Sequence, residues 1–330
     1  MIDIHLHLDG SMSVEDYVEL ALNYGVDLGK GFPNDIYVTN NCLSLAMYLT
    51  RFDKPVKLLQ CKDAIKFAVK SLIYRLSFMG YIYAEIRFAP LLHTNKGMTQ
   101  LEAAQGALEG LEEALRQCPD LEANLILCCM RHAPEEQNLE TIEVANTLKG
   151  TRVVAVDLAG GETLHPSSYF KNVFDRAKQY GLNITIHAGE ATGSDEIMMA
   201  LDNGAKRIGH GVHLSLDEES VRRVKERDIC FEFCPTSNLQ TKSLQSYENV
   251  PLRQFMRLGI PVTLNSDNMT VSRTDAINEL KIMRRTFNLS KDEVYNLLLN
   301  SIYYSFAKPE TKRKLKEKLD QRIAGFYFNL

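Results

Sequence analysis

The run Val153-Val154-Ala155-Val156 is uninterrupted by any polar residue and is followed at once by Asp157. An apolar run of this length is typical of a strand that is buried on both faces, as the strands of a parallel sheet are. Similar runs recur along the chain and are separated by longer amphipathic stretches. We predict eight strands, over residues 2–8, 81–88, 121–130, 152–158, 182–187, 206–208, 229–233 and 260–264.

The stretches between these runs are predicted to be helices. Apolar residues share one helical face over residues 64–76, and capping boxes begin at Ser215 and at Ser290. Eight alternations of strand and helix, with no linker rich in Pro, Gly or Ser, predict an α/β fold with a single (β/α)8 TIM barrel domain over residues 1–330. The irregular stretch 25–57 is long for a connection. We therefore expect extra helices there, after the first strand, and a further one at the C-terminus.

The composition is that of an ordinary folded chain of 330 residues. Apolar residues make up 45% and the formal net charge is 38 − 42 = −4, which excludes a disordered chain. The slight acidity argues against nucleic acid or an anionic membrane as a partner, because those select a basic surface. Neither a signal sequence nor the roughly 18 apolar residues of a membrane helix can be seen. With seven cysteines, an odd number, we expect reduced thiols and a cytoplasmic location.

Unusual polar residues stand where the predicted strands end. They are His5 and His7, Asp157, His187, His210 and Asp267. The carboxyl ends of barrel strands meet at one rim, where the active sites of such barrels lie. Each residue alone has a structural alternative: an isolated strand histidine is usually a hydrogen-bonded core residue, and Asp267 could cap the following helix. Their joint placement on one rim favours a functional site.

Three imidazoles and one carboxylate at one rim suit a borderline metal ion such as Zn²⁺. Such an ion lowers the pKa of a bound water to about 7 and so provides hydroxide at neutral pH. Glu190 comes three residues after His187 and is expected near the metal without necessarily binding it. A carboxyl group in a closed apolar pocket has a raised pKa and can donate its proton. A salt bridge or a helix cap is the structural alternative for Glu190.

Six short motifs follow one another along the chain. They are His5-Leu6-His7-Leu8-Asp9-Gly10, Asp157-Leu158-Ala159-Gly160, His187-Ala188-Gly189-Glu190, Gly209-His210-Gly211, Cys234-Pro235-Thr236-Ser237-Asn238 and Ser266-Asp267. In this order and spacing they resemble the adenosine deaminase family of the amidohydrolase superfamily, and in particular its bacterial-type members. The resemblance covers nearly the whole chain. A lone H-x-H pair is common, whereas the full set of motifs is highly specific.

The resemblance implies an enzyme that deaminates adenosine, and also 2′-deoxyadenosine, by hydrolysis, with inosine (or its deoxy form) and ammonia as products, in purine salvage or nucleoside catabolism. One zinc ion per chain would be held by His5, His7, His187 and Asp267. Hydroxide on the zinc would attack purine C6 while Glu190 protonates ring N1. His210 would orient the hydroxide and share proton transfer with Asp267.

The same resemblance implies the contacts to the substrate. The residues concerned are His7, Asp9, Gly160, Glu190 and Asn268. Asp9 would bind a ribose hydroxyl, and the backbone N–H of Gly160 would meet ring N3. Asn268 stands where the family commonly has a second aspartate, at the residue that meets ring N7. Because its amide donates a hydrogen bond while neutral, the contact to N7 can be kept although the substrate preference can change.

Several other functions stay open. A two-metal amidohydrolase would commonly need a bridging lysine, and the fourth strand ends Asp157-Leu158-Ala159-Gly160 without one. The substrate could be another 6-aminopurine, such as adenine or an aminofutalosine-type nucleoside, and a zinc barrel that only binds nucleosides is a third alternative. A phosphorylated substrate is disfavoured, because Arg87 is the one candidate partner and is better interpreted as paired with a strand-end carboxylate. The oligomeric state is left open.

Overall fold

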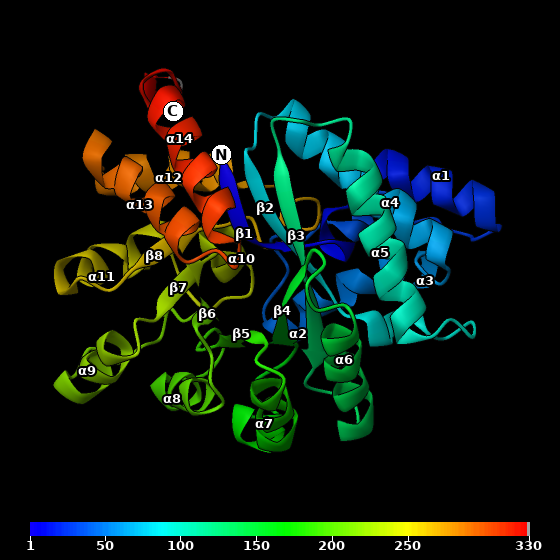
Figure 1. Cartoon of the computed structure of the whole chain (residues 1–330), viewed down its shortest axis with the longest axis horizontal. Coiled ribbons are helices and arrows are strands. Elements are labelled where there is room, and N and C mark those ends of the chain that lie inside the picture. Colours follow the sequence, from blue (N-terminus) through cyan, green and yellow to red (C-terminus); the bar gives the residue numbers. More distant parts are fainter. Residues whose placement is uncertain (329–330) are drawn as a thin grey trace.

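The computed structural model describes residues 1–328 and contains eight strands that follow one another around a barrel in chain order (Figure 1). They are β1 (Ile2–His7), β2 (Tyr83–Phe88), β3 (Glu122–Met130), β4 (Val153–Ala159), β5 (Asn183–Ala188), β6 (Arg207–His210), β7 (Cys230–Phe233) and β8 (Val262–Leu264). Every neighbouring pair is parallel. A bridge between Leu6 and Asp267 brings the segment after β8 back to β1 and nearly closes the barrel. The predicted (β/α)8 TIM barrel is confirmed.

Helices surround the strands and alternate with them (Figure 1). They are α1 (Val14–Tyr24), α2 (Leu45–Leu49), α3 (Asp53–Leu58), α4 (Lys62–Phe78), α5 (Gln100–Leu115), α6 (Glu135–Thr147), α7 (Lys171–Gln179), α8 (Ser194–Asp202), α9 (Glu218–Glu226), α10 (Pro235–Gln240), α11 (Leu252–Leu258), α12 (Ala276–Phe287), α13 (Lys291–Tyr303) and α14 (Pro309–Phe328). The short helices α2 and α3 lie in the irregular stretch after β1, and α14 ends the described chain. Both sets of extra helices are therefore present as predicted.

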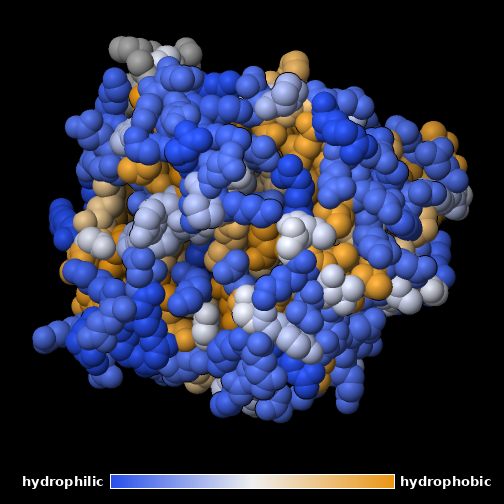
Figure 2. All heavy atoms as spheres, viewed as in Figure 1, coloured by the Kyte–Doolittle hydropathy of each residue, from blue (hydrophilic) through white to orange (hydrophobic). Residues whose placement is uncertain are grey.

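Hydrophilic residues cover most of the face seen in Figure 2, and apolar residues show between them. Over residues 1–328, no helix combines the length and the apolar character needed to cross a membrane. The seven cysteines all lie in this part of the chain, and each thiol is free, as the odd number suggested.

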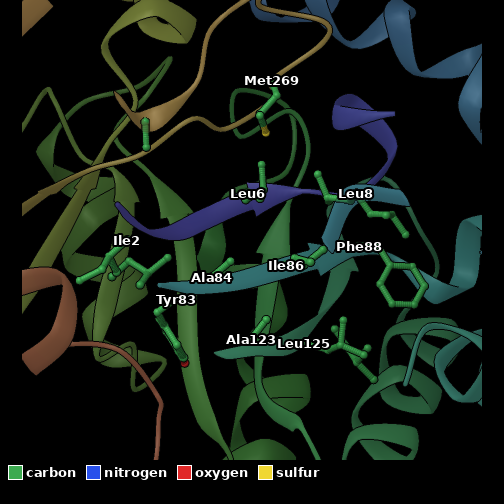
Figure 3. Close-up of a cluster of buried hydrophobic side chains, with 14 of the residues drawn as sticks. Ile2, Leu6, Leu8, Tyr83, Ala84, Ile86, Phe88, Ala123, Leu125 and Met269 are labelled. Carbon is green, nitrogen blue, oxygen red and sulfur yellow. The ribbon is translucent and has the colours of Figure 1, made fainter. Parts of the chain in front are cut away.

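The alternation of side chains along β1 both builds the core and supplies the site. Ile2, Ile4 and Leu6 are fully buried and belong to the apolar layer between the strands and the helices, part of which Figure 3 shows. Burying one such side chain contributes about 1.5–3 kcal/mol. Because successive strand residues face opposite sides, His5 and His7 point into the barrel instead.

Two local predictions can be compared with the structure at the helix starts. The capping box at Ser290 is confirmed, since its hydroxyl accepts the Glu293 N–H and the Glu293 side chain accepts the Ser290 N–H. The capping box at Ser215 is wrong. Helix α9 begins at Glu218, and its cap is Asp217, whose carboxylate accepts the N–H of Ser220. Asp217 is an equally good capping residue two positions later, so it displaces the serine.

Candidate active site

The barrel rim brings together the four residues suggested as metal ligands. His5 and His7 come from β1, His187 from β5, and Asp267 follows β8. One ligand atom from each lies within 4.8 Å of the others. The His7 and His187 Nε2 atoms are 3.1 Å apart, and Asp267 Oδ1 is 3.6 Å from His5 Nε2 and 3.4 Å from His7 Nε2. The residues that were predicted separately from strand ends thus form one cluster.

Buried carboxylates orient two of these imidazoles. His5 Nδ1 is 2.7 Å from Glu232 Oε2, and His187 Nδ1 is 3.1 Å from Asp157 Oδ1. A carboxylate accepts, so we assign the hydrogen to Nδ1 in both rings and a lone pair to both Nε2 atoms. His5 Nε2 is buried and has no hydrogen-bond partner among the described residues. Converging lone pairs beside a carboxylate are what a zinc ion requires, so the donor set fits that metal.

Burial also acts on the charge of the cluster. It lowers the pKa of His187, and it holds the pKa of His7 well below its usual value, so both rings are neutral and available as ligands. For Asp267, burial alone would raise the pKa, but the contacts with His5, His7 and His210 outweigh it and keep the pKa below its ordinary range. The carboxylate therefore stays ionised.

Arg87 links the two orienting carboxylates. Its Nη1 lies 3.0 Å from Asp157 Oδ2 and its Nη2 lies 2.9 Å from Glu232 Oε2, and all three side chains are fully buried. Nη2 also donates to the carbonyl of Ile4 at 2.7 Å. The sequence suggested such an ion pair for Arg87, and the structure shows it. Glu232 was missed, although a glutamate inside the apolar strand Cys230-Phe231-Glu232-Phe233 is itself a signal of an inward-facing charge.

Glu190 lies beside this cluster and is buried. Its Oε2 is 3.6 Å from His210 Nε2, and its Oε1 accepts a hydrogen bond from the Thr241 hydroxyl at 3.1 Å. Burial raises the pKa of Glu190, and the nearby carboxylates of Asp267 and Glu162 add to the effect. The group is therefore suited to hold a proton and to release it to a base.

His210 is held by Asn238, whose side-chain amide donates to His210 Nδ1 at 3.1 Å. Because Nδ1 accepts this bond, we assign a hydrogen to Nε2, which faces Glu190. Both His210 (φ 61°) and Asp267 (φ 58°) adopt the left-handed backbone conformation that side chains disfavour. Strain of this kind, of order 1–3 kcal/mol per residue, gathers at functional sites.

A cavity of about 610 Å³ opens above the cluster. His7, Asp9, Gly160, Glu190, His210 and Asn268 all line it. Its other walls are largely apolar and come from α2, α3 and the turn between them, and from the chain at or just after the ends of β2 and β3; they include Leu45, Leu49, Phe52, Val56, Phe88, Leu92 and Met130. Gly160 has φ 102°, which only glycine adopts without strain, and this turns the chain at the cavity wall. The cavity is large enough for a nucleoside-sized ligand.

Asn268 is fixed by Tyr48, a residue of α2 that sequence reasoning missed. The amide Nδ2 donates to the Tyr48 hydroxyl at 2.9 Å, and that hydroxyl lies 2.7 Å from Ser272 Oγ. Asn268 Oδ1 sits against Gly10, where an added Cβ would come within 1.9 Å of it. One N–H of the amide is thereby left for a ligand. Tyr48 lies in an irregular segment with no periodic pattern, so no sequence signal placed it in the site.

Asp9 lines the cavity, and His93 lies behind it as a second polar side chain. Asp9 is buried, and its Oδ1 has no hydrogen-bond partner within residues 1–328. His93 Nε2 lies 4.0 Å from Asp9 Oδ2. Burial raises the pKa of Asp9 to about 6 and lowers the pKa of His93 to about 4. An unsatisfied buried carboxylate oxygen at a cavity wall is suited to accept a ligand hydroxyl.

Comparison with known proteins gives consistent results. The family model described as adenosine deaminase matches residues 1–322. An adenosine deaminase of Haemophilus ducreyi is 43% identical over 330 residues, which cover 98% of this chain and 96% of that protein. The N6-mAMP deaminase of Arabidopsis has a TM-score of 0.86 at 27% identity, with 97% of each chain covered. The adenine deaminase of Arthrobacter aurescens has a TM-score of 0.89 over 98% of each chain, but at 23% identity it shows a shared fold alone.

Proposed function

This chain belongs to the adenosine deaminase family, and on that premise we propose that it converts adenosine and water into inosine and ammonia, and 2′-deoxyadenosine likewise. The observation that carries the proposal is the cluster of His5, His7, His187 and Asp267 with Glu190 beside it at the floor of one cavity. Metal ligands and a buried proton donor at one place are what a hydrolytic substitution on a purine ring requires.

The four clustered residues would hold one zinc ion per chain. Support comes from the converging lone pairs, the partnerless His5 Nε2 and the ionised Asp267 described above. When bound, the ion would supply a water activated for attack at neutral pH. Glu232 and Asp157 would keep the His5 and His187 rings turned toward that ion.

Glu190 would act as the general acid. Its protonated carboxyl would donate to ring N1, which draws electrons from C6 and makes that carbon easier to attack. His210, with its hydrogen on Nε2, would orient the attacking water, and Asp267 would accept the proton that the water releases. That proton would then pass to the departing ammonia, and the remaining proton of the added hydroxyl would return to Glu190 as C6 becomes a carbonyl, so that the reaction is balanced.

The remaining residues would orient the substrate. Asp9 would accept a hydrogen bond from a ribose hydroxyl, and His7, which lines the same cavity, would contact the substrate as well. The Gly160 N–H would donate to ring N3, and the free N–H of the Asn268 amide would donate to ring N7. The apolar walls from α2, α3 and β2 would cover the faces of the purine and exclude water.

The deciding experiment is the ultraviolet absorbance of adenosine mixed with zinc-loaded protein. Adenine and a chelator-stripped sample serve as controls. We expect rapid conversion of adenosine, slow or no conversion of adenine, and loss of activity on stripping that added zinc restores. Bound zinc without turnover of adenosine would overturn the proposed substrate and direct attention to Asn268.

A further inference from the structure

Glu162 is a buried carboxylate that none of the roles above uses. It closes the motif Asp157-Leu158-Ala159-Gly160-Gly161-Glu162 and is only 3% exposed. Its Oε2 accepts the backbone N–H of Gly189 at 2.9 Å, and its Oε1 accepts the N–H of Thr192 at 2.6 Å. Oε1 also accepts the N–H of Ala191. Three backbone donors from one loop thus meet a single side chain.

Those donors flank Glu190 on both sides. Residues 189–192 form an irregular bend between β5 and α8, so these N–H groups are not part of a strand or helix ladder. Buried backbone donors need a partner, and Glu162 supplies it. We propose that Glu162 is a positioning residue that fixes this bend and thereby aims the Glu190 side chain at the substrate ring; the proposal rests on the role of Glu190 given above.

A carboxylate is needed for this arrangement. Its two oxygens offer about four acceptor sites, which is enough for all three N–H groups. In Glu162→Gln, one oxygen becomes an NH₂ group that would face a backbone N–H, so at least one bond is lost. Glu162→Asp keeps both oxygens but is one methylene shorter, so it should retain part of the arrangement. The other end of Glu190 is held independently by Thr241.

The charge of Glu162 has a second effect on Glu190. The groups that influence the pKa of Glu190 are Glu162 and Asp267, which raise it together with burial, and His210 and His187, which lower it. Glu190 donates only while protonated, so activity is lost as the pH rises through its pKa. Removing the Glu162 charge lowers that pKa. The alkaline loss of activity should then move to lower pH, which a purely structural defect would not cause.

The test compares Glu162→Gln and Glu162→Asp with Glu279→Gln as a matched control. Glu279 is a fully buried carboxylate that accepts the Thr236 N–H at 3.0 Å and the Thr274 hydroxyl, and it does not touch Glu190. We expect E162Q to lower kcat by about 10–100-fold with unchanged zinc content, since small misplacements near the chemistry cost that much. E162D should recover part of the loss, and E279Q should stay within about threefold of wild type.

Hydrogen exchange provides a readout that does not depend on turnover. The amides of Gly189, Ala191 and Thr192 should be protected in the wild type and in E279Q but exchange faster in E162Q. Unchanged protection in E162Q overturns the proposal. A loss of kcat that is the same at every pH, and that is as large in E162D as in E162Q, overturns it as well. If wild type does not deaminate adenosine at all, the proposed function fails, and the exchange data still decide whether Glu162 holds the bend.

Discussion

The barrel rim and the segment over its mouth (residues 25–57) hold their residues in different ways. Side chains on the rim come from strand ends and are backed by buried ion pairs such as that of Arg87 with Glu232. The mouth segment contains only short elements, namely the helices α2 and α3 and two single turns of 3-10 helix, and Leu43 within it is 70% exposed. Yet this segment supplies Tyr48 to the site. From this difference we expect the rim to carry the proposed chemistry and the mouth segment to adjust how the substrate fits.

The largest effect should come from the rim residue closest to the chemistry. Glu190→Gln removes the proton donor but keeps the size of the side chain, so kcat should fall by about 10²–10⁴-fold, the range of general acid catalysis. Zinc content, measured by metal analysis, should not change. Near-normal turnover would contradict the assignment, and a comparable loss on changing Tyr48 would remove the distinction between rim and mouth segment.

Arg87→Met should reveal how strongly the rim is supported. It would leave Asp157 and Glu232 as buried charges without this cation, and such a loss costs about 3–5 kcal/mol of the free energy of unfolding. Urea denaturation measures that change, and chelator competition should show weaker zinc binding. The matched change in the mouth segment is Arg51→Met, which loses one hydrogen bond to the Asp35 carbonyl and should cost about 1 kcal/mol. Equal losses of unfolding free energy in Arg87→Met and Arg51→Met would contradict the proposed difference between the rim and the mouth segment.

Tyr48→Phe should act on substrate discrimination. It releases the Asn268 amide, and the loss of one hydrogen bond of about 1 kcal/mol predicts a roughly fivefold fall in kcat/KM for adenosine. Discrimination between adenosine and 7-deazaadenosine, which lacks the N7 acceptor, should shrink by a similar factor. Tyr37→Phe is the control from the same segment, because its ring contact with Arg273 is kept. An equal fall in kcat/KM for adenosine and 7-deazaadenosine would argue against a contact at N7.

The smallest effect should come from the apolar wall. Val56 is half-buried and lines the cavity, so Val56→Ala removes only part of one apolar contact with the purine. We expect KM to rise about twofold with kcat unchanged, because the two methyl groups removed are only partly buried and each contributes a fraction of the free energy of a fully buried one. Steady-state kinetics measures both parameters. A change in kcat instead of KM would mean that the mouth segment affects the reaction step and not only substrate binding.

Sequence reasoning succeeded where a regular pattern constrained the residue. Strand period and strand ends placed His5, His187 and Asp267 on one rim, because all barrel strands end on the same side. It missed Glu232 and Tyr48. Tyr48 meets Asn268 across 220 positions of the chain, and no local pattern encodes such a pairing. Irregular segments have no period from which a side-chain direction can be read, so their contribution appears only in three dimensions.

The close approach of Asn268 to Gly10 makes these two positions interdependent over evolutionary time. An added Cβ at position 10 would come within 1.9 Å of the amide oxygen, so any larger residue there requires a smaller or redirected side chain at position 268. A change at position 268 that vacates this space would in turn release the restriction to glycine. Neither position changes freely alone, and the Asn268 side chain can be exchanged only along mutational routes that respect its partner, 258 residues earlier in the chain.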